Sequence, residues 1–109
     1  MAEAIPDAAL VVRGGRNQPE NLRRGMATHP SGMRGVSVEC AEGMSVDDLA
    51  ACIPHNQVGV STVGAIRAAG GDVVRTSGRS RHHATLIGLS DEEASRLLTP
   101  TILNPAKRP

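Results

Sequence analysis

The sequence predicts one compact domain of the α/β or α+β class, built on a mixed β-sheet of four or five strands with short helices. Its 109 residues suffice for one hydrophobic core and are too few for two. Patterns typical of strands and helices alternate along the chain, and the last two strands follow each other directly. We therefore expect a single domain over residues 1–109, with flexible, extended ends at residues 1–7 and 104–109.

The core has to be aliphatic, because the chain contains no Phe, Tyr or Trp. Binding modules for single-stranded nucleic acid commonly stack bases on aromatic side chains, so this class is disfavoured. The formal net charge is only +1, which excludes a generally polycationic surface. Any anion-binding site must therefore be local.

In the N-terminal half, a nearly continuous apolar run predicts a central strand over residues 8–13, covered on both faces and ended by a Gly-Gly turn. A short helix follows over residues 17–25, because Pro suits its first turn and Gly its end. Strict alternation predicts a strand over residues 36–40. The capping residue Ser45 and an apolar stripe predict a helix over residues 44–53.

In the C-terminal half, residues 57–61 have the pattern of a third strand. A Thr cap and a terminating Gly pair predict a helix over residues 63–69. The segments 72–76 and 82–87 alternate as strands, and the short Ser/Gly/Arg connection between them predicts an antiparallel hairpin. A capping box then predicts a last helix over residues 90–98.

This hairpin concentrates cations and contains no acidic residue between its strands. His83 and Thr85 lie on one face of their strand, and Arg81, Arg79 and Arg75 lie close by in sequence. Cleavage of RNA without a metal needs a proton acceptor and donor, and cations for the charge on phosphate. We assign His83 to proton transfer, Thr85 to a hydrogen bond with phosphate, and the arginines to anion binding. The alternative is a solvated turn with a hydrogen-bonded histidine.

A second group consists of Arg13, at the end of the first strand, and Ser37 in a later strand. Together they could hold the phosphates and ribose of a nucleotide, although Arg13 could instead pair with Glu39 or be exposed. Arg13 and His83 meet if the last strand runs antiparallel to the first. We predict that they border one cleft, with the loop of residues 79–81 beside it.

Motifs for ATP binding, Rossmann-type dinucleotide binding and zinc proteolysis are missing, and the four histidines are not spaced as metal ligands. We therefore expect no metal and, for the RNA-cleaving hypothesis, no cofactor. Two buried reduced thiols at Cys40 and Cys52 are favoured over a disulfide. The sequence has no apolar run of 18 residues and no signal-peptide pattern, so we expect a cytoplasmic protein without membrane association.

The motifs VVRGG, GVSV, VGVST, GGDVV and HHATL, at residues 11–15, 35–38, 58–62, 70–74 and 82–86, span most of the chain. In this pattern the chain resembles short toxin-like proteins of high-GC bacteria. More loosely, it is similar to ADP-ribosyltransferase-like bacterial toxins, including a family of secreted antibacterial effectors.

That family has an early strand with Arg, a central strand with Ser and a late strand with His. The resemblance therefore implies a site of Arg13, Ser37 and His83 around NAD. The chain departs from the family in two respects. Its late glutamates, Glu92 and Glu93, fall in the capping turn of the last helix, and no aromatic ring is available to stack on nicotinamide.

Three functions remain open. The first is a small bacterial toxin that cleaves RNA through the His/Arg/Thr cluster and is covered by an acidic antitoxin or immunity protein. The second is an ADP-ribosyltransferase-like toxin that uses NAD. The third is a non-enzymatic module of the antitoxin or immunity type that binds a protein partner, with the apolar segment 97–103 as its contact.

Overall fold

A computed structural model describes residues 4–78 and 80–107. Seven strands form the sheet in the order β5-β6-β3-β1-β4-β7, and β2 pairs with β3 off this path. Every pairing between described strands is antiparallel. The strands are β1 (Leu10–Gly14), β2 (Ala27–Thr28), β3 (Arg34–Ala41), β4 (Gln57–Thr62), β5 (Asp72–Arg75), β6 (His83–Ile87) and β7 (Ile102–Leu103).

The helices are short, and three of them begin directly after capping residues that the sequence predicts. They are α1 (Pro19–Gly25), α2 (Val46–Ala50), α3 (Val63–Ala68), α4 (Asp91–Leu97) and the 3₁₀ helix η1 (Pro105–Lys107). The side chains of Ser45, Thr62 and Ser90 each accept a hydrogen bond of 3.1 Å from a backbone N–H of the first turn.

The predicted class, with a single compact domain of strands and short helices, is confirmed. The sheet itself differs, because it has seven strands rather than four or five and its described pairings are antiparallel rather than mixed. The α-helices have only five to seven residues and span roughly 8–10 Å, less than the length of the longer strands. Such a helix does not carry the chain back along a strand, so helical connections do not imply parallel strands here.

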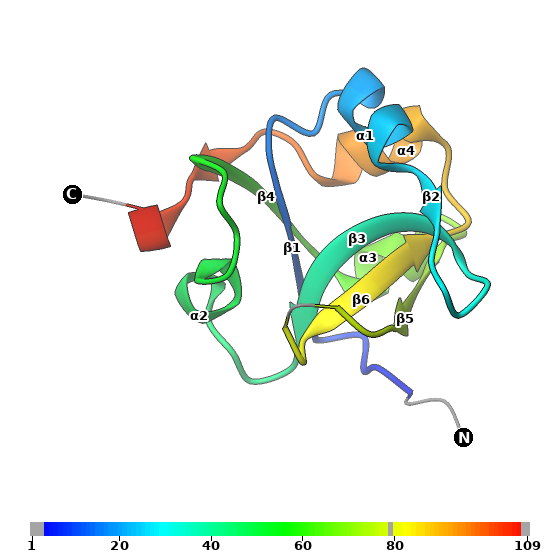
Figure 1. The fold of residues 1–109 in the computed structure, drawn as a ribbon, viewed down its shortest axis with the longest axis horizontal. Coiled ribbons are helices and arrows are strands. Elements are labelled where there is room, and N and C mark those ends of the chain that lie inside the picture. The colour runs from blue at the N-terminus through cyan, green and yellow to red at the C-terminus, as the bar shows by residue number, and fades with distance from the viewer. Residues whose placement is uncertain (1–3, 79, 108–109) are drawn as a thin grey trace.

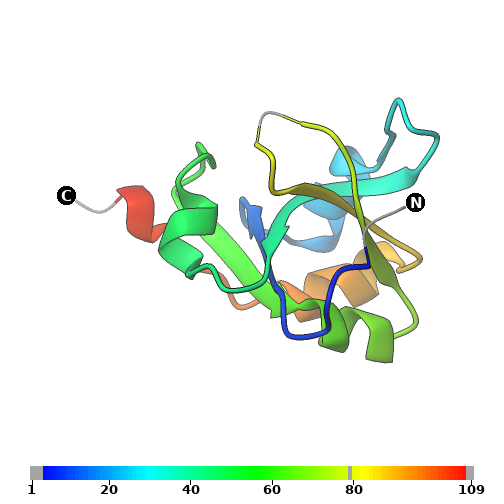
Figure 2. The same cartoon turned by 90° about the horizontal axis from the view of Figure 1, so that it is seen from below.

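Helices cover both faces of the central strand β1 (Figures 1 and 2). Val11 faces the larger hydrophobic cluster, which is closed by α1, α3 and α4, while Val12 faces a smaller cluster closed by α2. Both valines are fully buried. The interpretation of residues 8–13 as a strand covered on both sides is therefore confirmed.

The two ends of the described chain are packed rather than free. Ile5 is buried in the larger cluster, and Asp7 forms an ion pair with Arg67. Asn104 is buried, and the following residues form η1 instead of an extended tail. No helix within the described ranges is long and apolar enough to span a membrane.

The apolar segment 97–103 also packs mainly on its own domain. Leu98 is fully buried, and β7 pairs with β4. Ile102 and Leu103 are exposed, Leu103 by 69%. The segment thus closes the edge of the sheet and leaves only these two apolar side chains for other contacts.

The sheet divides where β1 and β3 separate. Their pairing ends at Val12 opposite Glu39. From there β1 continues along β4 as far as Gly14, whereas β3 curves away and continues along β6 (Figure 1). This separation opens a fork in the middle of the sheet, and the fork positions the site described next.

Candidate active site

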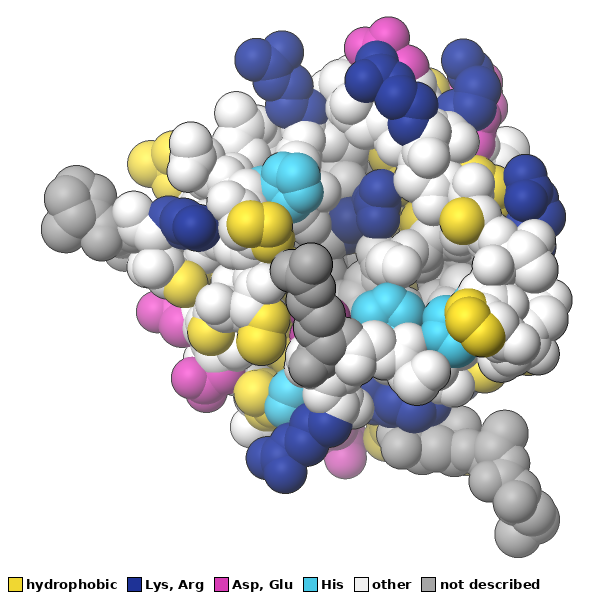
Figure 3. All heavy atoms as spheres, viewed as in Figure 1, with side chains coloured by type: hydrophobic (Ala, Val, Ile, Leu, Met, Phe, Trp, Pro, Cys, Tyr) yellow, Lys and Arg dark blue, Asp and Glu magenta, His cyan; other side chains and the backbone are white. Residues whose placement is uncertain are grey.

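A cavity of about 430 Å³ lies at this fork. The end of β1, the middle of β3, the segment after α2 and the β5–β6 loop enclose it. Its lining residues are Val12, Arg13, Gly14, Ser37, Val38, Glu39, Cys52, Ile53, Pro54, His55, Gly78, Ser80 and His83. Figure 3 shows the molecule hollowed near its centre, with histidine side chains on the same face.

Arg13 crosses the gap between the separated strands. Its Nη1 donates a 2.7 Å hydrogen bond to the carbonyl of Ser37, which has no β1 partner at this point. Its Nε is buried and has no hydrogen-bond partner among the described residues. Burial lowers the pKa of the Arg13 guanidinium, although arginine stays protonated in proteins. A half-buried cation with a free donor favours an anionic ligand.

Two neighbours fix the position of Arg13. The buried Asn17, with φ of 56°, donates from Nδ2 to the carbonyl of Arg13 at 3.0 Å. Gly25, at the end of α1, lies against the guanidinium, and a Cβ at this position would collide with Nη2. A glycine at the helix end therefore makes the room that the arginine head occupies.

Glu39 brings an opposite charge to the same cavity. Its Oε1 is buried and also lacks a hydrogen-bond partner among the described residues. Glu39 and Arg13 do not form an ion pair, so the simple salt bridge considered from the sequence is wrong. Glu39 lies opposite His83 in the β3–β6 register, at a non-hydrogen-bonded position where side chains on one face approach most closely.

His83 is fixed by hydrogen bonds and close packing. Its Nδ1 lies 2.9 Å from the hydroxyl of Thr76, and its ring stacks on that of His29 with centroids 5.9 Å apart. His29 in turn joins the 28–33 turn to the β5–β6 loop through a 2.7 Å hydrogen bond between Nε2 and the carbonyl of Ser77. A Cβ at Gly78 would collide with the His83 ring, so this loop lies directly on it.

The opposite wall is formed by the segment between α2 and β4. Ile53 and Pro54 give it an apolar surface, and His55 and Cys52 add an imidazole and a thiol. Asn104 braces this wall by donating from Nδ2 to the carbonyls of Ile53 at 3.1 Å and His55 at 2.9 Å.

Cys40 and Cys52 do not form a disulfide. Cys40 is buried as expected, but Cys52 is exposed at the cavity, so the prediction of two buried thiols is wrong for Cys52. Cys52 follows the short helix α2, which ends three residues before the predicted end of that helix. Cys52 therefore lies beyond the helix and its buried apolar side chains.

Three predicted site residues, Arg13, Ser37 and His83, line the same cavity. The predicted cleft between Arg13 and His83 therefore exists, but the reason given for it is wrong. Both β1 and β6 run antiparallel to β3, so β6 runs in the same direction as β1. Arg13 and His83 meet because the fork brings the end of one strand and the start of the other to a common opening.

The remaining predicted residues do not form a separate site. Thr85 is only 4% exposed and bonds to Thr76, behind the cavity. Arg75 donates to the carbonyls of Cys40 and His82, so its guanidinium closes the sheet edge. Arg81 is exposed and does not line the cavity. Arg79 lies outside the described residues.

Sequence reasoning missed Glu39, His55, Thr76 and Asn17. Glu39 was within reach, because it is two residues from Ser37 and alternation places both on the same face of the strand. Thr76 was also within reach, since the hairpin sets it opposite His83. Nothing in the local sequence around His55 or Asn17 indicates their long-range contacts.

No protein-family model matches this chain, and neither the curated proteins nor the solved structures include a match. Within the described residues, no three His, Cys, Asp or Glu side chains group as metal ligands. The geometry and charge of the cavity are therefore the basis for assigning a function.

Proposed function

We propose that the cavity binds NAD and that the protein is an ADP-ribosyltransferase-like toxin. One observation carries the proposal: Arg13 and Glu39 line the same cavity, have opposite charges, and each has a buried polar atom without a partner among the described residues. Such groups are costly to bury unless a ligand satisfies them.

NAD suits this pair of charges because it carries negative charge on one part and positive charge on another. Its diphosphate is anionic and matches the guanidinium of Arg13, while its nicotinamide ring is cationic and matches the carboxylate of Glu39. An RNA segment offers only anionic phosphates, which Glu39 would repel. The apolar side chains of Ile53 and Pro54 supply a surface for the uncharged edge of the pyridine ring. This surface replaces the aromatic stacking that the chain lacks.

In the proposed reaction, the bond between ribose C1′ and the nicotinamide nitrogen breaks. The bonding electrons leave with nicotinamide, which becomes neutral, and positive charge develops on the ribose. The carboxylate of Glu39 stabilises that charge. An acceptor hydroxyl or water then bonds to C1′ and gives its proton to His83. Glu39 thus takes the place of the family's late glutamate, because Glu92 and Glu93 lie in the first turn of α4.

The direct test of this reaction is release of nicotinamide from NAD by the purified protein, with water as acceptor. We expect release by the wild type and at least a hundredfold slower release by Glu39→Gln, since electrostatic groups of this kind contribute factors of about 10²–10³. Arg67→Met serves as a control that changes a paired surface charge. Equal rates in wild type and Glu39→Gln would contradict the assignment of Glu39.

As a toxin, the protein should arrest bacterial growth when produced alone. His83→Ala and Arg13→Ala should both relieve the arrest. Neither substitution removes a core side chain, so unfolding would not be the cause of the relief. We expect an acidic antitoxin or immunity protein as the partner, because it would complement the cation of Arg13 at the cavity. Harmless production of the wild type at a high level would contradict the toxin proposal.

Cleavage of RNA is a second candidate, favoured by the two imidazoles of His55 and His83 on facing walls of the cavity. Such a pair could supply the base and the acid for metal-independent cleavage. In that case His55→Ala should abolish RNA cleavage, and a nucleoside 3′-phosphate should raise the melting temperature more than NAD does.

A further inference from the structure

The ring of His83 is held by contacts at Nδ1, on one ring face and along one ring edge. Its Nδ1 lies 2.9 Å from the hydroxyl oxygen of Thr76 and 3.3 Å from the carbonyl oxygen of the same residue. His29 covers one ring face, and Gly78 lies against the Cγ–Cδ2 edge. Within the described part of the chain, Nε2 is the ring nitrogen without a hydrogen bond, and His83 lines the cavity.

The partners of Nδ1 determine which nitrogen carries the proton. A carbonyl oxygen can only accept, so its proximity favours a proton on Nδ1. The hydroxyl of Thr76 then accepts from Nδ1 and donates its own proton to the hydroxyl oxygen of Thr85, 2.9 Å away. If the Thr76 hydroxyl instead donated to Nδ1, the lone pair of Nδ1 would also face the lone pairs of the Thr76 carbonyl oxygen, and the two would repel each other. Thr76 is 8% exposed and Thr85 4% exposed, so little solvent competes for these bonds.

We propose that Thr76, supported by Thr85, is a positioning residue that holds neutral His83 in the Nδ1–H tautomer. In this form the lone pair of Nε2 is free to accept a proton in the cavity. This inference rests on the proposed function in one respect only, the identity of the group that gives its proton to His83. The tautomer itself is a property of this chain and can be measured without any substrate.

The tautomer can be read from the ¹⁵N chemical shifts of the imidazole nitrogens in histidine-labelled full-length protein. The measurement is made at about pH 8.5, where an ordinary histidine with a pKa of about 6.5 is neutral. The signals of His83 are assigned as those lost in His83→Gln. We expect a protonated Nδ1 and an unprotonated Nε2 in the wild type. A wild-type spectrum with the proton on Nε2 would overturn the proposal.

Variants then test the role of the two hydroxyls. Thr76→Val removes the acceptor, and Thr85→Val frees the Thr76 proton to turn toward Nδ1. Each should shift the tautomer ratio toward Nε2–H by roughly threefold to tenfold, the effect of one hydrogen bond. Thr76→Ser and Thr85→Ser should keep the wild-type ratio. Thr99→Val is the matched control, because its hydroxyl donates to the carbonyl of Ser95. An unchanged ratio in both valine variants would contradict the proposal.

The outcome is separable from that of the proposed function. If NAD does not bind, the ¹⁵N spectra still decide whether Thr76 fixes His83. If NAD binds and the wild-type tautomer is Nε2–H, only the positioning role of Thr76 fails. Where nicotinamide release is measurable, Thr76→Val should lower kcat at neutral pH with little change in KM, and Thr76→Ser should restore it.

Discussion

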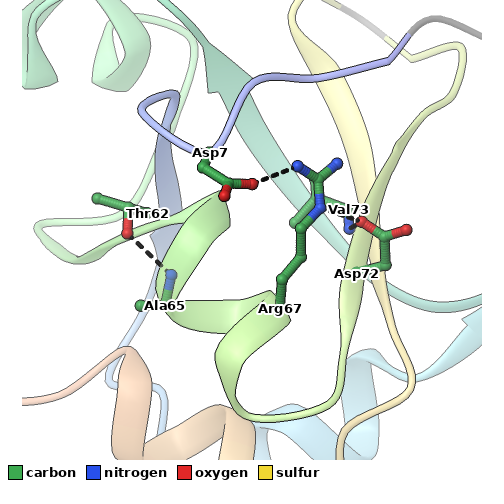
Figure 4. Close-up of polar contacts among 6 residues, drawn as sticks. All are labelled: Asp7, Thr62, Ala65, Arg67, Asp72 and Val73. Carbon is green, nitrogen blue, oxygen red and sulfur yellow. Dashed lines mark hydrogen bonds and ion pairs between the residues drawn. The ribbon is translucent and has the colours of Figure 1, made fainter.

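Arg13 and Arg67 differ in whether carboxylates neutralise their charge. Arg67, at the end of α3, donates from Nη1 to Asp7 at 2.6 Å and from Nε to Asp72 at 2.9 Å (Figure 4). Hydrogen bonds to Asp7 and Asp72 raise the pKa of Arg67. Arg13 is more deeply buried and has no carboxylate partner among the described residues. Among the described residues, the side chain of Arg13 makes one hydrogen bond, to the carbonyl of Ser37.

Arg67 therefore holds parts of the fold together, whereas the buried Nε of Arg13 has no partner among the described residues, as expected of the proposed ligand site. Asp7 and Asp72 come from segments far apart in sequence, and Arg67 ties both to α3. Satisfied charges of this kind contribute modestly to stability and nothing to binding. An unsatisfied buried charge reduces stability, and it persists where binding compensates for it.

The largest expected effect is loss of ligand binding in Arg13→Met. Removing one partner of a buried charge-assisted contact costs about 2–5 kcal/mol, so NAD should bind roughly 30-fold to 5,000-fold more weakly. The unfolding free energy should be unchanged or raised, because a desolvated cation is removed. Isothermal titration and urea unfolding measure the two quantities.

Arg67→Met is the matched control in the other region. It should leave NAD affinity unchanged and slightly lower the melting temperature, by less at high salt than at low salt. A large loss of NAD affinity in this variant would show that the two arginines do not differ as described.

The next effect concerns space rather than charge. Gly25→Ala places a methyl group where the Arg13 guanidinium lies, so we expect about tenfold weaker NAD binding. Gly64→Ala is its counterpart in α3, where a Cβ meets Asp7 at 3.2 Å and requires only a small adjustment. That variant should bind NAD normally, because Gly64 does not line the cavity. Equal affinities in the two variants would mean that Gly25 does not control Arg13.

The smallest effect is the pH dependence of another satisfied charge. The backbone N–H and the hydroxyl of Ser90 donate to Glu93 and lower its pKa below the ordinary 4.5. Because the folded pKa is depressed, the stabilisation is complete above 4.5 and is lost as the pH falls through the folded value. Glu93→Gln should therefore flatten the acid limb of stability below about pH 4.5. Glu92→Gln, on the same turn but outside the capping box, should retain that limb.

Much of the local structure was predictable because local chemistry determines it. Ser45, Thr62 and Ser90 bond to the backbone within three residues, so their caps can be identified from sequence alone. The two-residue strands β2 and β7 are too short for alternation to reveal them. Strand direction also escaped prediction, since it depends on how short helices turn the chain.

The candidate site was predictable only in part. Arg13, Ser37 and His83 were chosen from strand positions and a family resemblance, and the fork brings them together. Proximity in sequence misled for Thr85, which faces the expected side of its strand but is covered by Thr76. The unpaired state of Glu39 depends on where β3 leaves β1, and no local pattern encodes that separation.

The most direct measurement compares the affinities of NAD and ADP-ribose, which share the diphosphate and differ by the cationic nicotinamide ring. If Arg13 binds the diphosphate and Glu39 binds the nicotinamide ring, wild type should bind NAD roughly tenfold more tightly than ADP-ribose, a difference of about 1.4 kcal/mol. Glu39→Gln should lose this preference while still binding ADP-ribose, and Arg13→Met should bind both weakly. Equal affinity of wild type for the two ligands, or no binding of NAD, would contradict the account.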